Sequence, residues 1–237
     1  MNAKKHIIFL SFSFFFLALS AESTPLDKLD IRSVILAKNG LINCEKLGNE
    51  NQIFLCNDEE LGKQVVVKSF NSSMMNEYFK EKPILEYLQI TGIVKLYKSI
   101  EDRESNRYFL VLEYSAYGDL KGLIKNKNSI SEDVARLLFI QFINAFSKMH
   151  DNQIAHRDIK LENLLLVHDN KVKVIDFGGS DDLRNGKTAN QETLGTEYTS
   201  APEVYHKELR ENGQLDPYKS DVFSAGAVLA IMVVGTS

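Results

Sequence analysis

The sequence lacks any run of basic residues, and its formal net charge is −4. Lysine and arginine are scattered along the chain, so no segment is suited to follow a nucleic-acid backbone or an anionic membrane. Internal repeats and low-complexity segments are also missing, which excludes a repeat array. With 44% hydrophobic and 25% charged residues, the 237-residue chain is typical of one or two packed domains. We therefore expect a globular protein with no nucleic-acid partner.

Long apolar runs are scarce, and the first lies close to the N-terminus. Residues 7–19 are apolar apart from two serines and follow a short basic start, and residues 18–20 resemble a signal-peptidase site. The run is shorter than the roughly 20 apolar residues of a membrane span. We therefore expect residues 1–20 to be a cleaved signal peptide, and the protein to be in the secretory pathway or secreted. A membrane anchor formed by residues 7–19 is the alternative.

Cysteine is rare, with only Cys44 and Cys56 in the whole chain. Both are predicted on the solvent side of two paired antiparallel strands, one diagonal step apart. A disulfide is permitted in a secreted protein, but we expect two free thiols. The chain also carries one N-glycosylation sequon, at residues 71–73, in a predicted exposed loop.

The predicted elements divide the chain into a strand-rich first part and a helical second part. Hydrophobic patterns and turn residues predict strands at residues 41–47, 52–56, 64–70, 93–99, 108–113, 164–167 and 171–175, and helices at 74–88, 131–151 and 220–234. Ser129 or Ser131 is the expected N-cap of the second helix. The two parts join near residues 113–118, and a cleft between them is the expected site.

Three short motifs carry the most specific signal in the sequence. They are residues 156–163 (HRDIKLEN), 176–178 (DFG) and 201–203 (APE), with Lys68 upstream and the segment 220–226 downstream. In order and spacing they resemble the catalytic loop, the metal-binding triplet and the loop-closing triplet of protein kinases. The chain is identified on these motifs as a member of the eukaryotic-type protein kinase family, Ser/Thr branch.

The resemblance extends over most of the chain and implies a fold. It predicts an α+β, two-lobed protein-kinase-like fold in which residues 41–114 form a small antiparallel sheet lobe. Residues 115–237 form a mainly helical lobe, and residues 21–40 are a lead-in. The apolar segment after Ser220 is then a buried central helix, so we expect no stable membrane span in the mature chain.

The resemblance also assigns chemical roles to the polar residues of these motifs. Phosphoryl transfer depends on positioning and charge stabilisation. Asp158 is expected to orient the attacking hydroxyl, and Lys160 to reach the γ-phosphate, which is the mark of the Ser/Thr branch. Asn163 and Asp176 offer the oxygen ligands that Mg²⁺ prefers.

A second group of residues is expected to bind ATP. Lys68 is predicted to hold the α- and β-phosphates and to pair with Glu81. Contacts with the rest of the nucleotide are expected from Gly48, Leu55, Val66, Glu113, Ser115, Asp119 and Leu165. The implied cofactors are ATP and Mg²⁺, and the implied partner is a protein substrate with serine or threonine.

The loop between the second and third motifs is expected to be regulatory. Arg157 beside Asp158 suggests control by an anion on this loop, because arginine pairs well with phosphate. Thr193 is the expected phosphorylation site, and Glu192 the alternative source of negative charge. Thr196 is expected to bond the catalytic loop and shape the substrate site.

Three departures from the family pattern favour a catalytically impaired pseudokinase as the alternative function. Only Gly48 remains of the three glycines that cover the phosphates, and Glu50 adds a negative charge there. Pro83 is expected to kink the helix or to begin it, and so to displace Glu81. The family continues beyond residue 237 with helices that supply an arginine for Glu203. We therefore expect an incomplete helical lobe whose exposed apolar patch is covered by a partner.

Overall fold

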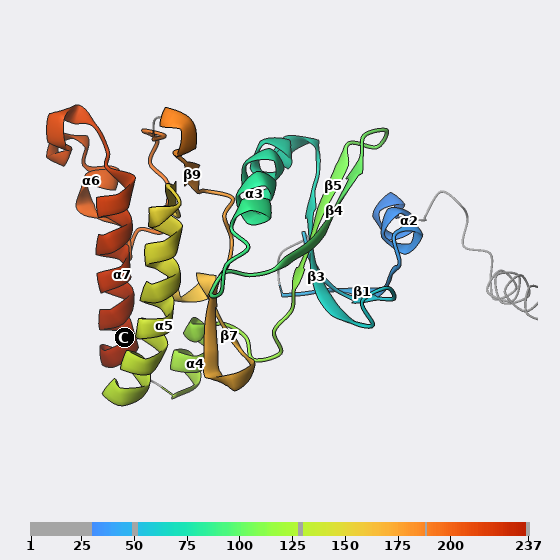
Figure 1. Ribbon diagram of the computed structural model, residues 1–237, viewed down its shortest axis with the longest axis horizontal. Helices are drawn as coiled ribbons and strands as arrows, with labels where there is room; N and C mark the ends of the chain where they lie inside the picture. The colour runs from blue at the N-terminus through green and yellow to red at the C-terminus, as the bar shows by residue number, and fades with distance from the viewer. Residues whose placement is uncertain (1–29, 49–51, 128–129, 188, 236–237) are drawn as a thin grey trace, which may run out of the picture.

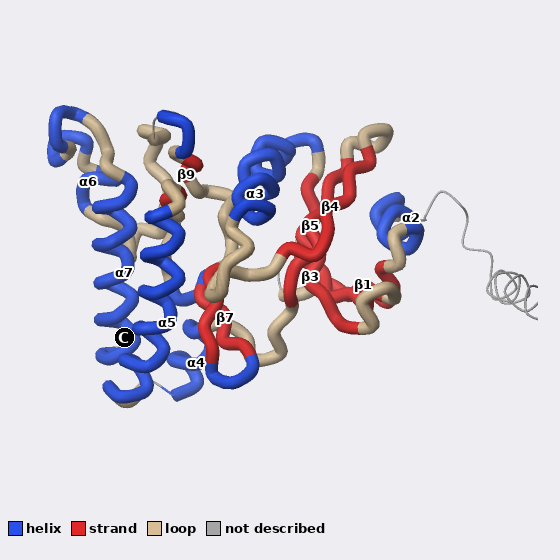
Figure 2. The backbone as a smooth tube through the Cα atoms, viewed as in Figure 1, coloured by secondary structure: helices blue, strands red, loops and turns tan. Residues whose placement is uncertain are grey.

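A five-stranded antiparallel sheet forms one lobe. A group of helices forms the other lobe (Figures 1 and 2). The computed structural model describes residues 30–48, 52–127, 130–187 and 189–235, so the predicted signal peptide lies outside the described residues. The sheet has the order β1-β2-β3-β5-β4. Its strands are β1 (Leu41–Lys46), β2 (Ile53–Asp58), β3 (Lys63–Phe70), β4 (Leu96–Asp102) and β5 (Arg107–Glu113). These strands confirm the predicted sheet lobe.

The two faces of the sheet are covered by different helices, α2 (Ile31–Lys38) and α3 (Met75–Tyr87). Figure 1 shows α3 on the side of the helical lobe and α2 on the other side. Helix α2, which the sequence analysis did not predict, begins after the N-cap Asp30 and buries Ile35 and Leu36 against the sheet. Because side chains alternate along a strand, β3 contributes Val65 to this layer and Val66 to the opposite face.

Helix α3 continues through Pro83, contrary to the expectation that the proline would displace Glu81. The helix begins at Met75, and Pro83 lies in its interior. Glu81 is 1% exposed and remains next to Lys68. Side chains on the same helix bond to the sheet, since Tyr78 and Lys82 both donate to Glu101 of β4. These contacts hold the helix although proline removes one backbone hydrogen bond.

Cys44 and Cys56 form a disulfide between β1 and β2, so the expectation of two free thiols was wrong. The expected solvent-side position was also wrong for Cys56, which is 1% exposed and packs in the layer under α2. The physical reason is a β-bulge between Ile42 and Glu45, where Asn43 has a φ of 50°. The extra residue in β1 brings Cys44 opposite Cys56.

The helical lobe contains four α-helices in the part of the chain that the structure describes. They are α4 (Leu120–Lys127), α5 (Glu132–Asp151), α6 (Pro202–Tyr205) and α7 (Pro217–Val234), with the strand pairs β6 (Ile154–Ala155) with β9 (Asp181–Asp182), and β7 (Leu164–Val167) with β8 (Lys171–Val174). Short 3-10 turns lie at Ser72–Met74, Leu161–Asn163, His168–Asn170, Arg184–Gly186, Lys207–Leu209 and Glu211–Gly213. Ser131, one of the two predicted caps of α5, is its N-cap, and its side chain accepts from the Val134 N–H. Ser129, the other predicted cap, lies outside the described residues.

Helix α7 packs beside α5 and is the only described helix with the length and mean hydropathy, 1.3, of a membrane span. Length and composition alone do not distinguish such a span from a core helix. Seven of its residues are buried, among them the carboxylate of Asp221. Val222, Phe223 and Val233 on the same helix are exposed.

Candidate active site

A cleft of about 490 Å³ lies between the two lobes. Its walls come from both lobes and from the connection between them. The lining residues are Leu47, Ile53, Val66, Lys68, Glu81, Val94, Leu112, Glu113, Tyr114, Ser115, Gly118, Asp119, Lys160, Glu162, Asn163, Leu165, Ile175 and Asp176. The structure thus brings most of the predicted site residues together in one cavity.

The loop after β6 is held from below by Asp221 of α7. Arg157 has a φ of 68°, and the backbone N–H groups of His156 and Arg157 both point toward this carboxylate. Each donates to a different oxygen of Asp221 at 2.7 Å, and Asp221 itself is fully buried. Two charge-assisted hydrogen bonds therefore fix the loop just before Asp158.

His156 connects the same loop to the segment that carries Asp176. Its Nε2 lies 2.9 Å from the Ile175 carbonyl, and its Nδ1 lies 3.3 Å from the Asp158 N–H. The carbonyl can only accept and the N–H can only donate, so the neutral tautomer with the proton on Nε2 satisfies both. The fully buried ring therefore sets the separation of the two segments.

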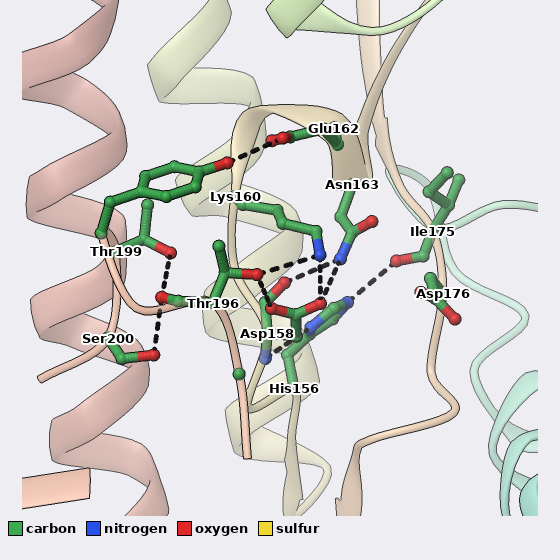
Figure 3. A network of polar contacts seen from close by, with 12 residues as sticks. His156, Asp158, Lys160, Glu162, Asn163, Ile175, Asp176, Thr196, Thr199 and Ser200 are labelled. Carbon is green, nitrogen blue, oxygen red and sulfur yellow. Dashed lines mark hydrogen bonds and ion pairs between the residues drawn. The ribbon is translucent and has the colours of Figure 1, made fainter. Parts of the chain in front are cut away.

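The carboxylate of Asp158 is oriented by three side chains (Figure 3). The Thr196 hydroxyl donates to Oδ1 at 2.7 Å, while Lys160 Nζ lies 2.7 Å from Oδ2. Asn163 Nδ2 donates to the Asp158 carbonyl at 2.8 Å and to Oδ2 at 3.2 Å. Lys160 also donates to the Thr196 hydroxyl at 3.0 Å. The structure therefore places Asp158, Lys160, Asn163 and Thr196 in one network.

The predicted metal ligands Asn163 and Asp176 fit a magnesium ion. The Asn163 amide nitrogen is used on Asp158, and its oxygen points toward the side where Asp176 lies (Figure 3). The Asp176 side chain is 43% exposed and uses Oδ1 to bind Lys68. Mg²⁺ takes one or two such oxygen ligands together with phosphate oxygens. The available donors match that requirement.

Lys68 forms the centre of the charge cluster on the opposite wall. Its ammonium lies 2.7 Å from Glu81 and 2.8 Å from Asp176. Burial opposes the charged form, but the two carboxylates outweigh it, so the pKa of Lys68 is raised above its ordinary value. Burial raises the pKa of Glu81, whose other oxygen accepts from the Phe177 N–H at 3.4 Å. The predicted pairing of Lys68 with Glu81 is present.

The roof of the cleft differs from the sequence prediction. Gly48 is exposed and Leu55 is half-buried, and neither lines the cavity. Leu47 and Ile53 line the roof of the cavity instead. Ile53 occupies the position at which the family pattern has its third glycine. Its side chain extends into space that a glycine leaves open. Residues 49–51, and with them Glu50, lie outside the described residues.

The other residues predicted to contact nucleotide lie on β3, on β7 and along the connection between the lobes. Val66 from above and Leu165 from below face the cavity, as predicted. The Glu113 carboxylate turns away from it to bind Lys173, which leaves the backbone of the connection for a ligand. Ser115 donates to the Leu166 carbonyl, and Asp119 accepts from the Gly122 N–H at 2.7 Å, so both are tied to neighbouring elements.

Arg157 is already paired, which the sequence analysis did not predict. Its side chain is 2% exposed and lies 2.9 Å from the carboxylate of Asp181 in β9. It also donates to the carbonyls of Asn190 and Glu192. Exposed Thr193 makes its side-chain hydrogen bond to the Val204 carbonyl instead. The Glu192 carboxylate accepts from Asn190, so it is not the charge partner of Arg157.

A further unpredicted residue, Arg210, stabilises the end of the loop. Its guanidinium is buried and donates to the carbonyls of Gln191, Glu203 and Val204 at distances between 2.9 and 3.1 Å. Arg210 therefore holds the backbone of the APE motif. A single buried arginine in a polar stretch gives no sequence signal for this role.

Comparisons with known proteins agree with this geometry. Residues 45–237 match the family model described as the protein kinase domain. Similar proteins are the serine/threonine-protein kinase kin-29 of Caenorhabditis briggsae (35% identity), CBL-interacting protein kinase 11 of Oryza sativa subsp. japonica (30%) and calcium-dependent protein kinase 4 of Plasmodium berghei (31%). The alignments cover 66%, 87% and 79% of this chain, but only 18%, 41% and 36% of those proteins. The chain belongs to the protein kinase family.

Proposed function

We propose that the protein is a Ser/Thr kinase that transfers the γ-phosphate of Mg-ATP to serine or threonine hydroxyls of a protein substrate. One observation carries the proposal: the Asp158 carboxylate is held in a network with Lys160 and Thr196, across the cleft from an assembled Lys68–Glu81 pair. The name of one similar protein, the serine/threonine-protein kinase kin-29, supports the Ser/Thr class.

The proposed chemistry follows from the positions of these side chains. A substrate hydroxyl placed at Asp158 donates its proton to the carboxylate as its oxygen bonds to the γ-phosphorus. The bond from the γ-phosphorus to the β,γ-bridging oxygen breaks, and ADP leaves. Lys160, 2.7 Å from Asp158, supplies positive charge where the transferred group passes.

Nucleotide binding is assigned to the walls described above. Lys68 stays protonated and holds the phosphates, while Val66 and Leu165 enclose the base. When bound at Asn163 and Asp176, Mg²⁺ neutralises phosphate charge and orients the transferred group. The aspartate is partly exposed, so a phosphate-bound ion can reach it.

Phosphate transfer from labelled ATP to a Ser/Thr peptide and to a tyrosine-only peptide tests the proposal. We expect transfer to the Ser/Thr peptide alone, with a loss of at least about 100-fold in Asp158→Asn. Asp133→Asn is the matched control, because Asp133 is an exposed aspartate of α5 that pairs only with Arg136. Absence of transfer from the folded protein would overturn the proposal. The glycine-poor roof would then favour the pseudokinase alternative.

We also propose that the protein acts in an oxidising compartment of the secretory pathway or outside the cell. The apolar residues 7–19 and the Cys44–Cys56 disulfide support this location. Cleavage after Ser20 in the natural host would support it, and is read by N-terminal sequencing. An uncleaved, membrane-bound protein would favour the anchor alternative instead.

A further inference from the structure

Helix α3 carries Glu81 and therefore has to hold a fixed position relative to both lobes. Tyr78 and Lys82 bond to Glu101, which ties the first part of the helix to the sheet. Pro83 follows, and its missing N–H removes one hydrogen bond from the turn that contains Glu81. The last turn of α3 therefore needs support from outside the helix.

Tyr87, the last residue of α3, is bound by the helical lobe. The Arg184 guanidinium carbon lies 3.8 Å from the centre of the Tyr87 ring, and the Tyr87 hydroxyl donates to Asn152 Oδ1 at 3.0 Å. Asn152 follows the end of α5, and its Nδ2 donates to the Lys148 carbonyl, which fixes the orientation of its amide. The tyrosine thus bridges the lobes away from the connection at Glu113.

Arg184 is itself oriented by the start of the loop that follows Asp176. Both its Nε and Nη2 bind the carboxylate of Asp182, at 2.7 and 2.9 Å. Asp182 belongs to β9 and pairs with Ile154 of β6, the strand that leads directly into the catalytic loop. A planar guanidinium held at both nitrogens stacks on an aromatic ring in one orientation.

We propose that Tyr87 and Arg184 form a positioning pair that couples the segment after Asp176 to helix α3 and so holds Glu81 against Lys68. A rearrangement that moves Arg184 releases the last turn of the helix beyond Pro83. The Lys68–Glu81 pair then separates. Neither residue is among those that line the cleft, so their effect on phosphate transfer passes through Glu81. This role rests on the proposed kinase function.

Steady-state kinetics of variants at the pair test the proposal. Tyr87→Ala and Arg184→Ala are each expected to lower kcat/KM for ATP about tenfold, within the range of a partly desolvated cation–π contact. Tyr87→Phe keeps the ring and retains most of the activity, whereas Arg184→Lys loses the planar stack and does not. The matched control is Phe79→Ala, because Phe79 is a similarly exposed aromatic residue of α3 whose ring packs against Tyr78 and Tyr108 in the sheet lobe.

Double variants separate positioning from a general loss of stability. If the pair acts as one unit through Glu81, the double variant Tyr87→Ala with Arg184→Ala has about the same kcat/KM for ATP as either single variant. In a Glu81→Gln background, Tyr87→Ala then has no further effect on kcat/KM. Multiplicative losses in either double variant would overturn the proposal, as would unchanged kinetics of Tyr87→Ala.

Amide hydrogen exchange gives a readout that does not depend on catalysis. We expect Tyr87→Ala to raise exchange both in residues 84–87 and in residues 181–187, while Phe79→Ala leaves the second segment unchanged. If the unaltered protein transfers no phosphate, the proposed function fails, but this measurement still decides the coupling. Increased exchange confined to α3 would contradict it. If Tyr87→Ala does not fold, Arg184→Lys serves for the same comparison.

Discussion

At the scale of single residues, Arg157 shows how a buried charge is satisfied inside this molecule. Its guanidinium lies against the Asp181 carboxylate and two backbone carbonyls, with almost no exposure to water. A phosphate on Thr193 would have to compete with a carboxylate that is already in place. The structure therefore argues that the order of this loop depends on Asp181.

Substitution of Asp181 tests this interpretation. Asp181→Asn leaves Arg157 buried without a counter-charge, and we expect the free energy of unfolding to fall by about 3 kcal/mol. Thr193→Ala removes one hydrogen bond, to the Val204 carbonyl, from an exposed residue, so its effect on stability is expected to stay within about 1 kcal/mol, with phosphate transfer nearly unchanged. Urea unfolding and transfer assays measure both. Activity that disappears after phosphatase treatment or in Thr193→Ala would restore Thr193 as the control point.

At the scale of elements, Glu101 joins α3 to the sheet. Lys82 and Tyr78 donate to this carboxylate and lower its pKa to about 2, compared with 4.5 for a free glutamate. A carboxylate with a lowered pKa in the folded state contributes stability above its unfolded pKa. The contribution is lost as the pH falls from about 4.5 toward 2.

The Glu101→Gln variant is therefore expected to be less stable at pH 7. We expect a loss of about 1–3 kcal/mol, because the carboxylate is 22% exposed and its interactions are partly screened. The difference from the unaltered protein should narrow below pH 4.5, as Glu101 takes up a proton. Urea titrations between pH 3 and 7 measure it. A difference that does not depend on pH would assign the effect to packing.

The disulfide is the second element-scale feature, since it joins the two strands that form the roof of the cleft. It links residues 12 positions apart, and loops of this size correspond to about 3 kcal/mol of stabilisation. We expect Cys44→Ser with Cys56→Ser to lower the melting temperature and to weaken nucleotide binding, and a reducing agent to do the same to the unaltered protein. The reducing agent should not affect the double variant. An equal effect on both proteins would contradict this role of the bond.

Sequence reasoning predicted most elements and missed those with weak local signals. Most strands of the sheet carry alternating or continuous apolar residues, so periodicity located them. The strand predicted at residues 93–99 is β4, Leu96–Asp102, whose mostly polar sequence gives a weaker signal. Helix α2 buries only Ile35 and Leu36, and β9 has only two residues, so neither has a readable pattern. The pairing of β9 with β6 is a tertiary feature, and Asp181 could therefore not be assigned to Arg157.

The same holds for the candidate site: residues in short local motifs were predicted, and features that depend on tertiary contacts were missed. Asp158, Lys160, Asn163 and Asp176 lie in short motifs with fixed spacing. Lys160, Asn163 and Asp176 line the cleft, and Asp158 bonds to the first two of them. Leu55 lies opposite Val66 in the β2–β3 register, but Ile53, two residues earlier on β2, lines the cavity instead of it. The disulfide was missed because a β-bulge leaves no signature in the residue types around Cys44.

At the scale of the whole molecule, the cleft lies between lobes that are joined by one hydrophobic cluster. Residues of the sheet lobe such as Phe70 and Leu110 belong to the same cluster as Phe142 and Phe177 of the helical lobe. A parallel bridge between Ile93 and Val174 joins the lobes as well. A ligand that contacts both walls should therefore stabilise the molecule as a unit.

A non-hydrolysable ATP analogue with Mg²⁺ is thus expected to raise the melting temperature of the whole protein. At 100 times its dissociation constant, binding contributes about 2.7 kcal/mol, which corresponds to about 5–10 °C for a chain of this size. Lys68→Met removes the charge between Glu81 and Asp176, so the shift should shrink at the same ligand concentration. Lys80→Met is the matched control, because Lys80 is an exposed lysine of α3.

Thermal unfolding, followed separately in each lobe, measures this effect. One transition whose midpoint rises with the ligand supports stabilisation of the whole molecule, and two transitions that stay unshifted would contradict it. An unshifted single transition would show that the glycine-poor roof does not retain nucleotide, whereas a shift that Lys68→Met reduces assigns the phosphate contact to that lysine.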